Sequence, residues 1–386
     1  MVRSGYGTFY TRNPLLYFFQ QMGGNPPFAA TFSYNNSITN GVPAMTLRAP
    51  MLQAGTPATT QSGVDRNFLL PNNQQWNLTV ERALGRNTVA SLAYLGNKGT
   101  HLFRGLNYNA SVIDPNTGKL VRSEPNFGTA NTVVQTSDAN SIYNAMQVEV
   151  RRRHSSGLSY QVNWTWAKGL DDTGPYANTN ILDIQDRARD RANSDYVRRH
   201  QVNSNFTWEL PVGRRKKFGA ALPRWADAAL GGWRLSGISR FTTGRYLTPT
   251  YSNTTGFTAS NRPDVVYGVS PDLPRDQRRQ GHWFNAKAFA VPPVLDPATG
   301  ILRFGNAGRN IVAGPQTNMF DGSLTKSFHV FGERRLLTLR MDMFNAFNHP
   351  NWANPDMNIS NVNTVGVISA INGTMRQTQL SAQFQF

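Results

Sequence analysis

Apolar and polar residues alternate strictly along several stretches of the chain. In one of them every second residue is apolar or aromatic, namely Leu158, Tyr160, Val162, Trp164 and Trp166, and each residue between them is polar. A period of two residues places neighbouring side chains on opposite faces of a β-strand, whereas a helix requires a period of 3.6. The stretch is therefore predicted to be a strand with one apolar face and one polar face.

The same alternation recurs along the chain and predicts an antiparallel all-β architecture. It indicates about ten strands, at residues 2–10, 74–84, 87–96, 144–153, 157–167, 200–210, 231–242, 318–329, 335–345 and 376–386. Most have the ~9–11 residues with which a tilted strand crosses a bilayer. Their polar faces are rich in Gln, Asn, Thr, Glu and Arg, as a water-filled lumen requires. Aromatic residues near strand ends, such as Trp76, Trp166, Trp208 and Trp233, suit the girdles of a membrane barrel better than a soluble sandwich.

The connections between these strands alternate in length. Short ones fall at 85–86, 154–156 and 330–334, a moderate one at 211–230, and long ones at 11–73, 97–143, 168–199, 243–317 and 346–375. Short periplasmic turns and long extracellular loops are typical of outer-membrane barrels. The pattern predicts a first strand that runs outward, and an outer-membrane location.

Composition removes several other classes of protein. The chain has 386 residues and no cysteine, which excludes disulfides and thiol chemistry. The longest apolar run near the N-terminus, Leu15 to Phe19, is far shorter than the ~20 residues of a membrane-spanning helix. Residues 4–8 do not have the apolar character of a signal peptide.

The chain has a net charge of +17, which raises the possibility of a nucleic-acid partner. Its basic runs, 151–153 and 214–217, adjoin predicted turns at one rim of the barrel, and no nucleic-acid-binding motif accompanies them. We therefore expect them to be hydrated or to contact lipid headgroups, and we expect no nucleic-acid partner.

Acidic residues gather in the predicted loop 168–199, and two interpretations compete for them. The six are Asp171, Asp172, Asp183, Asp186, Asp190 and Asp195. Oxygen ligands suit calcium, but Arg187, Arg189 and Arg191 lie among them and no calcium-loop spacing is present. This favours a solvated or ion-paired loop. The six histidines (101, 154, 200, 282, 329 and 349) are scattered. We predict no catalytic residue, no cofactor site and no metal site, and therefore no enzyme.

Five sequence blocks, in order, resemble the barrel of Oar-like TonB-dependent receptors. They are YLGNKGTHL at 94–102, DYVRRH at 195–200, LGGWRLSG at 230–237, DGSLTKSF at 321–328 and FNAFNHPN at 344–351. The resemblance implies energy-coupled uptake through a barrel of about 22 strands. It also implies a plug domain and a signal peptide, neither of which is recognised in residues 1–386, so we expect the chain to be the C-terminal part of such a barrel.

The resemblance extends to the last strand and to the expected partners. Leu380, Ala382, Phe384 and Phe386 lie on one face and resemble the assembly signal of bacterial outer-membrane barrels. The expected partners are outer-membrane lipid, the barrel-assembly machinery, the TonB complex (through the absent plug) and an extracellular ligand of unknown identity. Loops 11–73, 97–143 and 243–317 are expected to make most ligand contacts, because loops on a rigid scaffold carry recognition.

Two alternatives stay open at this stage. One is a structural or adhesion barrel of the Oar type without active transport. The other is a small passive porin closed by these ten strands alone, which an even strand count permits. Oligosaccharides, peptides and metal chelates are all possible ligands.

Overall fold

The computed structural model describes residues 1–11, 25, 32–33, 38–39, 42–43, 46, 56–57, 61–127, 131–174, 181–214, 216–253, 261–293, 302–330 and 335–386. The predicted loop 11–73 therefore lies mostly outside the described residues, as do positions 331–334 of the predicted turn at 330–334. No helix in the described part of the chain is long and apolar enough to cross a membrane.

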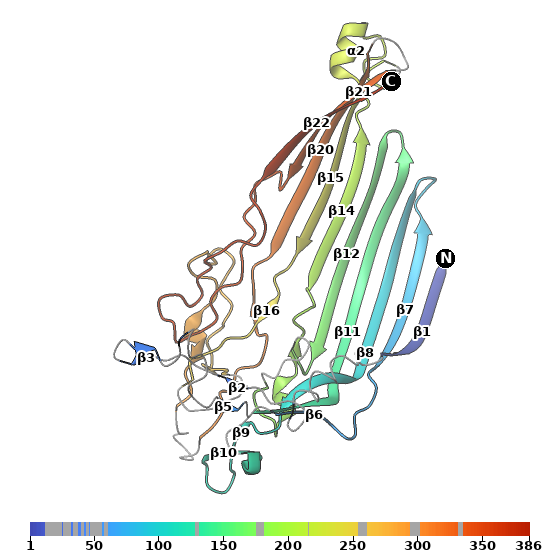
Figure 1. Cartoon of the computed structure of the whole chain (residues 1–386). Helices are drawn as coiled ribbons and strands as arrows, with labels where there is room; N and C mark the ends of the chain where they lie inside the picture. The colour runs from blue at the N-terminus through green and yellow to red at the C-terminus, as the bar shows by residue number, and fades with distance from the viewer. Residues whose placement is uncertain are drawn as a thin grey trace.

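One large sheet dominates the molecule, and long strands run side by side along it (Figure 1). Ten strands follow one another in sequence order, each antiparallel to the next: β1 (Val2–Tyr10), β7 (Asn72–Ala83), β8 (Thr88–Asn107), β11 (Thr132–Ser155), β12 (Leu158–Asp171), β14 (His200–Glu209), β15 (Trp233–Thr242), β20 (Thr317–His329), β21 (Leu336–Phe344) and β22 (Gln377–Gln385). These match the predicted strands. Among the described strands, β1 pairs with β7 alone and β22 with β21 alone, so these two form the edges of the sheet.

Short elements lie in the connections between these ten strands. They are β2 (Phe32–Ser33), β3 (Ile38–Thr39), β4 (Val42–Pro43), β5 (Thr56–Pro57), β6 (Gln61–Val64), β9 (Ser111–Ile113), β10 (Leu120–Arg122), β13 (Ala192–Asn193), β16 (Tyr246–Leu247), β17 (Asp264–Val265), β18 (Phe289–Ala290), β19 (Val312–Ala313), the 3₁₀ turns Pro125–Phe127, Arg187–Asp190 and Ala286–Ala288, and helix α2 (Arg224–Leu230). β6 adds to β11 in parallel, and β13 pairs with β12.

The prediction that 97–143 is a loop was wrong over much of its length. β8 extends to Asn107 and β11 begins at Thr132, and the two stay paired up to Val133 and Asn107. The pairing of β8 with β11 shifts register on both sides of Ala139, so the residues of β11 no longer face β8 in an unbroken ladder there. Backbone hydrogen bonds sustain these extensions beyond the amphipathic stretch, because a ladder needs no apolar face to continue.

The register sorts side chains onto two faces of the sheet. Paired residues such as Trp208 and Leu235, or Leu324 and Met341, share one face, which we call the apolar face. Paired residues such as Asn205 and Ile238 lie on the opposite face, where most positions are polar. Large residues of the apolar face remain uncovered, including Leu78, Leu92, Val162, Trp166, Leu339 and Leu380. An apolar surface of this extent needs hydrocarbon around it.

The two ends of the strands differ in what joins them. At one end lie the connections 84–87, 156–157, 210–232 and 330–335, which we call the short-turn rim. At the other end lie the remaining, longer connections, which we call the long-loop rim. In Figure 1 the short-turn rim is uppermost, with α2, and the loops gather at the bottom.

Gly96 of β8 is one position where the sheet requires glycine. Trp76 of β7 is its cross-strand partner, and a Cβ at Gly96 would fall inside the Trp76 indole ring. We expect Gly96→Val to lower the free energy of unfolding by about 1–3 kcal/mol, as overpacking does. Urea titration of the protein in lipid vesicles would measure it. Ala93→Val, on the other face of β8, serves as the control, and an equal loss in both variants would contradict the role of Gly96.

Candidate functional site: the long-loop rim

A buried ion-pair cluster ties two long connections to the end of β12 at the long-loop rim. Arg309 pairs with Asp171, at the end of β12, and its Nη1 lies 3.0 Å from Asp195 Oδ2. Asn310 donates to the Asp195 carboxylate at 3.1 Å and to the Asn193 carbonyl at 2.7 Å. Burial raises the pKa of the Asp171 carboxyl above its ordinary value, although Arg309 and a hydroxyl of Ser194 oppose this. The cluster fixes the 243–317 connection against the end of β12.

A second pair, Arg262 with Asp190, is more deeply buried. Their closest atoms are 2.7 Å apart, and the side chains are only 1% and 4% exposed. Burial raises the pKa of Asp190, while the Arg262 guanidinium favours its charged form. Because an isolated charge in such a place is costly, each partner requires the other.

A third group of charged residues lies where these connections meet the ends of β8, β11 and β12. Arg187 pairs with Asp172 and, at 3.5 Å, with Asp138, which also pairs with Arg104. Burial alone would raise the pKa of Asp138, but hydrogen bonding from Thr136 and the charge of Arg104 hold it below its ordinary value.

The ion-paired interpretation of the acidic loop is thus confirmed. Asp183 lies 4.0 Å from Arg189, and Asp186 accepts from the backbone of Ala188 at the start of a 3₁₀ turn. Among the residues that the structure describes, no three His, Asp or Glu side chains are grouped so as to hold a metal ion. His200 instead stacks on Trp164, and His154 lies 3.9 Å from Glu209.

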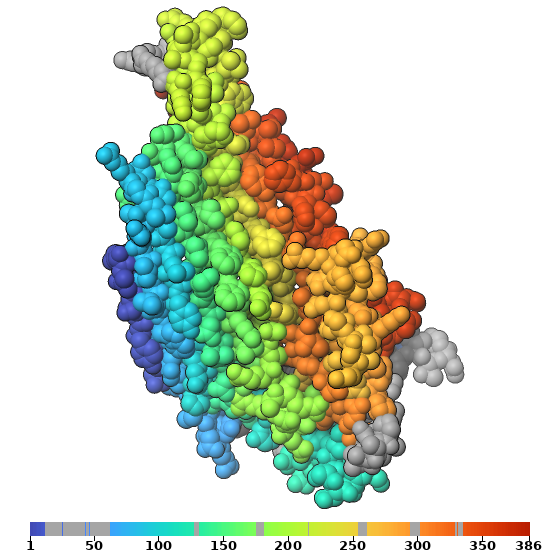
Figure 2. Space-filling model, turned by 180° about the vertical axis from the view of Figure 1, so that it is seen from behind, coloured from blue at the N-terminus to red at the C-terminus, as the bar shows by residue number. Residues whose placement is uncertain are grey.

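The long loops also have a hydrophobic core of their own, which sequence alternation does not reveal. It consists of Leu247, Trp283, Phe284, Ala288, Phe289, Val312 and Ile368, from the β15–β20 and β21–β22 connections. The Thr250 backbone bonds to Met357 and Ile359 across these connections, at 2.9 and 2.8 Å. We call this structure the loop layer. It protrudes over the strands as the orange mass in Figure 2.

A cavity of about 480 Å³ lies between the loop layer and the strand ends. Three arginines line it, Arg199, Arg275 and Arg278, and the described lining residues include no Asp or Glu. Trp283 and Trp352 meet edge to face in its wall, with ring centres 5.8 Å apart. The Trp283 indole donates to the Ala313 carbonyl at 2.8 Å, which fixes the ring.

The cavity brings together residues that sequence reasoning did not connect. Arg199 belongs to the DYVRRH block and His349 to the FNAFNHPN block, and both line it. Arg275 and Arg278 lie in the predicted ligand loop 243–317, without a motif to mark them. No local pattern in the sequence says which arginines meet.

A family model for an outer membrane beta barrel domain matches residues 1–379 of the chain. The chain belongs to this family. As an outer membrane beta barrel domain, it is located in the outer membrane, and its uncovered apolar face contacts lipid.

The barrel domain is also similar to parts of larger outer-membrane proteins of known structure. The outer membrane transporter YddB from Escherichia coli is 8% identical, with 85% of this chain and 34% of that chain covered and a TM-score of 0.45. The siderophore receptor PirA from Acinetobacter baumannii is 10% identical (100% and 38% covered, TM-score 0.42). The ferric-catecholate import receptor Fiu from E. coli is 10% identical (100% and 32%, TM-score 0.40).

The barrel domain therefore spans about a third of the length of these structures. No curated protein sequence matches it.

The opposite, short-turn rim of the barrel domain holds helix α2 and the last strands. Leu380, Ala382, Phe384 and Phe386 keep the period of two along β22 and its end, and Phe384 and Phe386 stack with ring centres 6.2 Å apart. Their proposed role as an assembly signal stays a prediction.

Proposed function

We propose that this barrel domain is the C-terminal barrel portion of an Oar-like TonB-dependent receptor, which takes up an anionic ligand captured at the long-loop rim. The observation that carries this proposal is the cavity with three arginines and two tryptophans, held between a rigid loop layer and the strand ends. Its volume of about 480 Å³ falls within the range of ~300–1,000 Å³ typical of small-molecule sites.

The lining chemistry supports an anion over a neutral ligand. Guanidinium groups bind carboxylates and phosphates in a two-pronged geometry, and they attract them into the cavity from a distance. Arg278 packs over the Trp283 ring at 5.9 Å, and it pairs with Asp272, which does not line the cavity, at 3.2 Å. A planar anionic ligand is able to use both the charge and the aromatic wall.

The open edges of the sheet support a place in a wider barrel. The backbone groups at the outer sides of β1 and β22 need partners within a bilayer, since each unpaired group costs several kcal/mol there. Further strands would supply them, and the contact with the TonB complex would belong to a plug domain. The short-turn rim then faces the periplasm. Its partners are lipid and the barrel-assembly machinery, and the protein performs no covalent chemistry.

The test measures accumulation of radiolabelled probes by cells that do or do not produce the whole receptor to which we assign this barrel domain. Three anionic probes represent the three open ligand classes: oligogalacturonate, hexaglutamate and ferric citrate; maltohexaose is the neutral control. We expect protein-dependent accumulation of at least one anionic probe and its loss when an uncoupler removes the proton-motive force. The double variant Arg275→Gln/Arg278→Gln should lower accumulation about tenfold, the effect of losing ~1.4 kcal/mol of binding.

The matched control is Arg279→Gln, an exposed arginine of the same loop that does not line the cavity. Accumulation that survives uncoupling would support a passive porin instead. Failure of all three anionic probes to accumulate would support a structural barrel, and an equal loss in Arg279→Gln would contradict the role of the cavity.

A further inference from the structure

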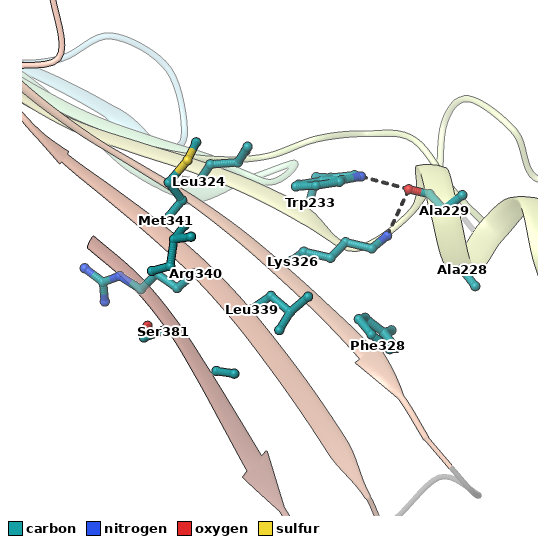
Figure 3. A pocket seen from close by; sticks show the side chains of 12 residues that line it. Ala228, Ala229, Trp233, Leu324, Lys326, Phe328, Leu339, Arg340, Met341 and Ser381 are labelled. Carbon is teal, nitrogen blue, oxygen red and sulfur yellow. Dashed lines mark hydrogen bonds between the residues drawn. The ribbon is translucent and has the colours of Figure 1, made fainter. Parts of the chain in front are cut away.

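A groove of about 740 Å³ runs along the apolar face beneath α2 at the short-turn rim (Figure 3). One wall is the outer surface of β20, β21 and β22, with Leu324, Leu339, Met341 and Leu380. Ala228 and Ala229 of α2 lie at its short-turn end, on the right in Figure 3.

A lysine lies at the α2 end of this groove, on the face that is otherwise apolar. Lys326 is 6% exposed, and its ammonium donates to the Ala229 carbonyl at 3.2 Å and to the Gly231 carbonyl. It also lies 5.1 Å from the centre of the Trp233 ring, whose indole donates to the same Ala229 carbonyl at 3.0 Å. Carbonyls at the C-terminal end of a helix lack intrahelical donors and carry partial negative charge, so they hold the ammonium in place.

The connection that carries α2 is rich in basic residues. It exposes four of them, Arg214, Lys216, Lys217 and Arg224. The nearby acidic residues in sequence are Asp227 and Glu209. Glu209 is already paired with Lys216 and Arg234, at 3.6 and 3.0 Å. Trp225, on α2, is 78% exposed, as an aromatic anchor at the headgroup level would be. This rim therefore combines an apolar groove, a fixed ammonium at its end and a basic border.

We infer that the groove holds one acyl chain of an anionic glycerophospholipid, with the lipid phosphate at the level of Lys326 and the basic connection. The apolar walls match a hydrocarbon chain, and the positive border matches the negative headgroup. Because the described residues that line the groove include no carboxylate, a zwitterionic lipid gains less from it than an anionic one. The α2 connection thus acts as a lipid clamp on the last strands, and this role does not depend on any ligand at the other rim.

Native mass spectrometry of the protein from outer membranes, exchanged into micelles that contain phosphatidylglycerol or phosphatidylcholine, tests this inference. We expect one phosphatidylglycerol to stay bound under conditions that strip all other lipid. Phosphatidylcholine should be retained about tenfold less, a difference of ~1.4 kcal/mol. Ala382→Trp, which fills the groove from β22, should abolish retention.

Two further variants keep the result interpretable. Ala90→Trp makes the same change on the same face of β8, away from α2, and should retain the lipid. Ala228→Trp blocks the groove from α2, outside the sheet, and should lose the lipid even if Ala382→Trp fails to fold. Equal retention by wild type and Ala228→Trp, equal retention of both lipids, or a bound lipid A species in place of the glycerophospholipid would each overturn the inference.

Discussion

We expect Arg262→Ala to lower the free energy of unfolding of the loop layer by about 3–5 kcal/mol, the usual cost of leaving one partner of a buried ion pair alone. The Asp190 carboxylate would keep its buried position without its guanidinium partner, 2.7 Å away. Arg262 also donates to the Arg189 carbonyl at 3.0 Å, so the variant loses a tie between two connections that are far apart in sequence. Hydrogen exchange of backbone amides at 181–195 and 261–293 would measure the loss.

The double variant Arg262→Met/Asp190→Leu separates charge from packing. Since it removes both charges and keeps apolar volume, we expect it to recover most of the stability that Arg262→Ala loses. Arg340→Ala is the exposed control: Arg340 pairs with Asp342 at 2.8 Å but is 54% exposed, so its loss should cost about 0–1 kcal/mol. Equal protection of these amides in wild type and Arg262→Ala would contradict a stabilising pair.

The positions of the strands could be predicted because a membrane environment imposes an alternation of apolar and polar residues on them. A strand that faces lipid on one side and water on the other must alternate, as Leu158 to Trp166 does, and the predicted 157–167 differs from β12 by only a few residues. Where a strand leaves the bilayer this constraint ends. The extensions of β8 to Asn107 and of β11 from Thr132 were therefore invisible to the period of two.

The site could not be predicted in the same way, because its contacts join distant residues without a local pattern. Asp190 and Arg262 are 72 positions apart, and Asp171 and Arg309 are 138 apart. Arg191, which the sequence places among the same acids, has no role in these pairs, whereas Arg262 and Arg309 come from a loop without any acidic cluster. Lys326 even breaks the alternation of β20, and only the fold shows that α2 supplies its acceptors.

Phe284→Ala should destabilise the hydrophobic core of the loop layer while the sheet stays folded. Phe284 is 1% exposed in the core of the loop layer, and its ring meets that of Phe289 edge to face, with centres 6.1 Å apart. Truncating a buried phenylalanine costs about 3–5 kcal/mol, and this small core, built by two connections, has few other residues with which to close the cavity. We expect amides at 245–253, 281–293 and 356–368 to exchange much faster, with β12, β14 and β15 unchanged.

Two observations decide whether this effect is local. Phe218→Ala removes the same ring at the short-turn rim, where Phe218 is 55% exposed, and should leave exchange in the loop layer unaltered. Heat-induced unfolding of the barrel strands, followed by circular dichroism in vesicles, should be the same in Phe284→Ala and wild type, because those strands are held by their ladders and by lipid. If the strands instead unfolded together with the loops, the loop layer and the sheet would be one cooperative unit. The cavity between them would then be a fixed feature of the barrel, which ligand binding could not reshape by moving the loops alone.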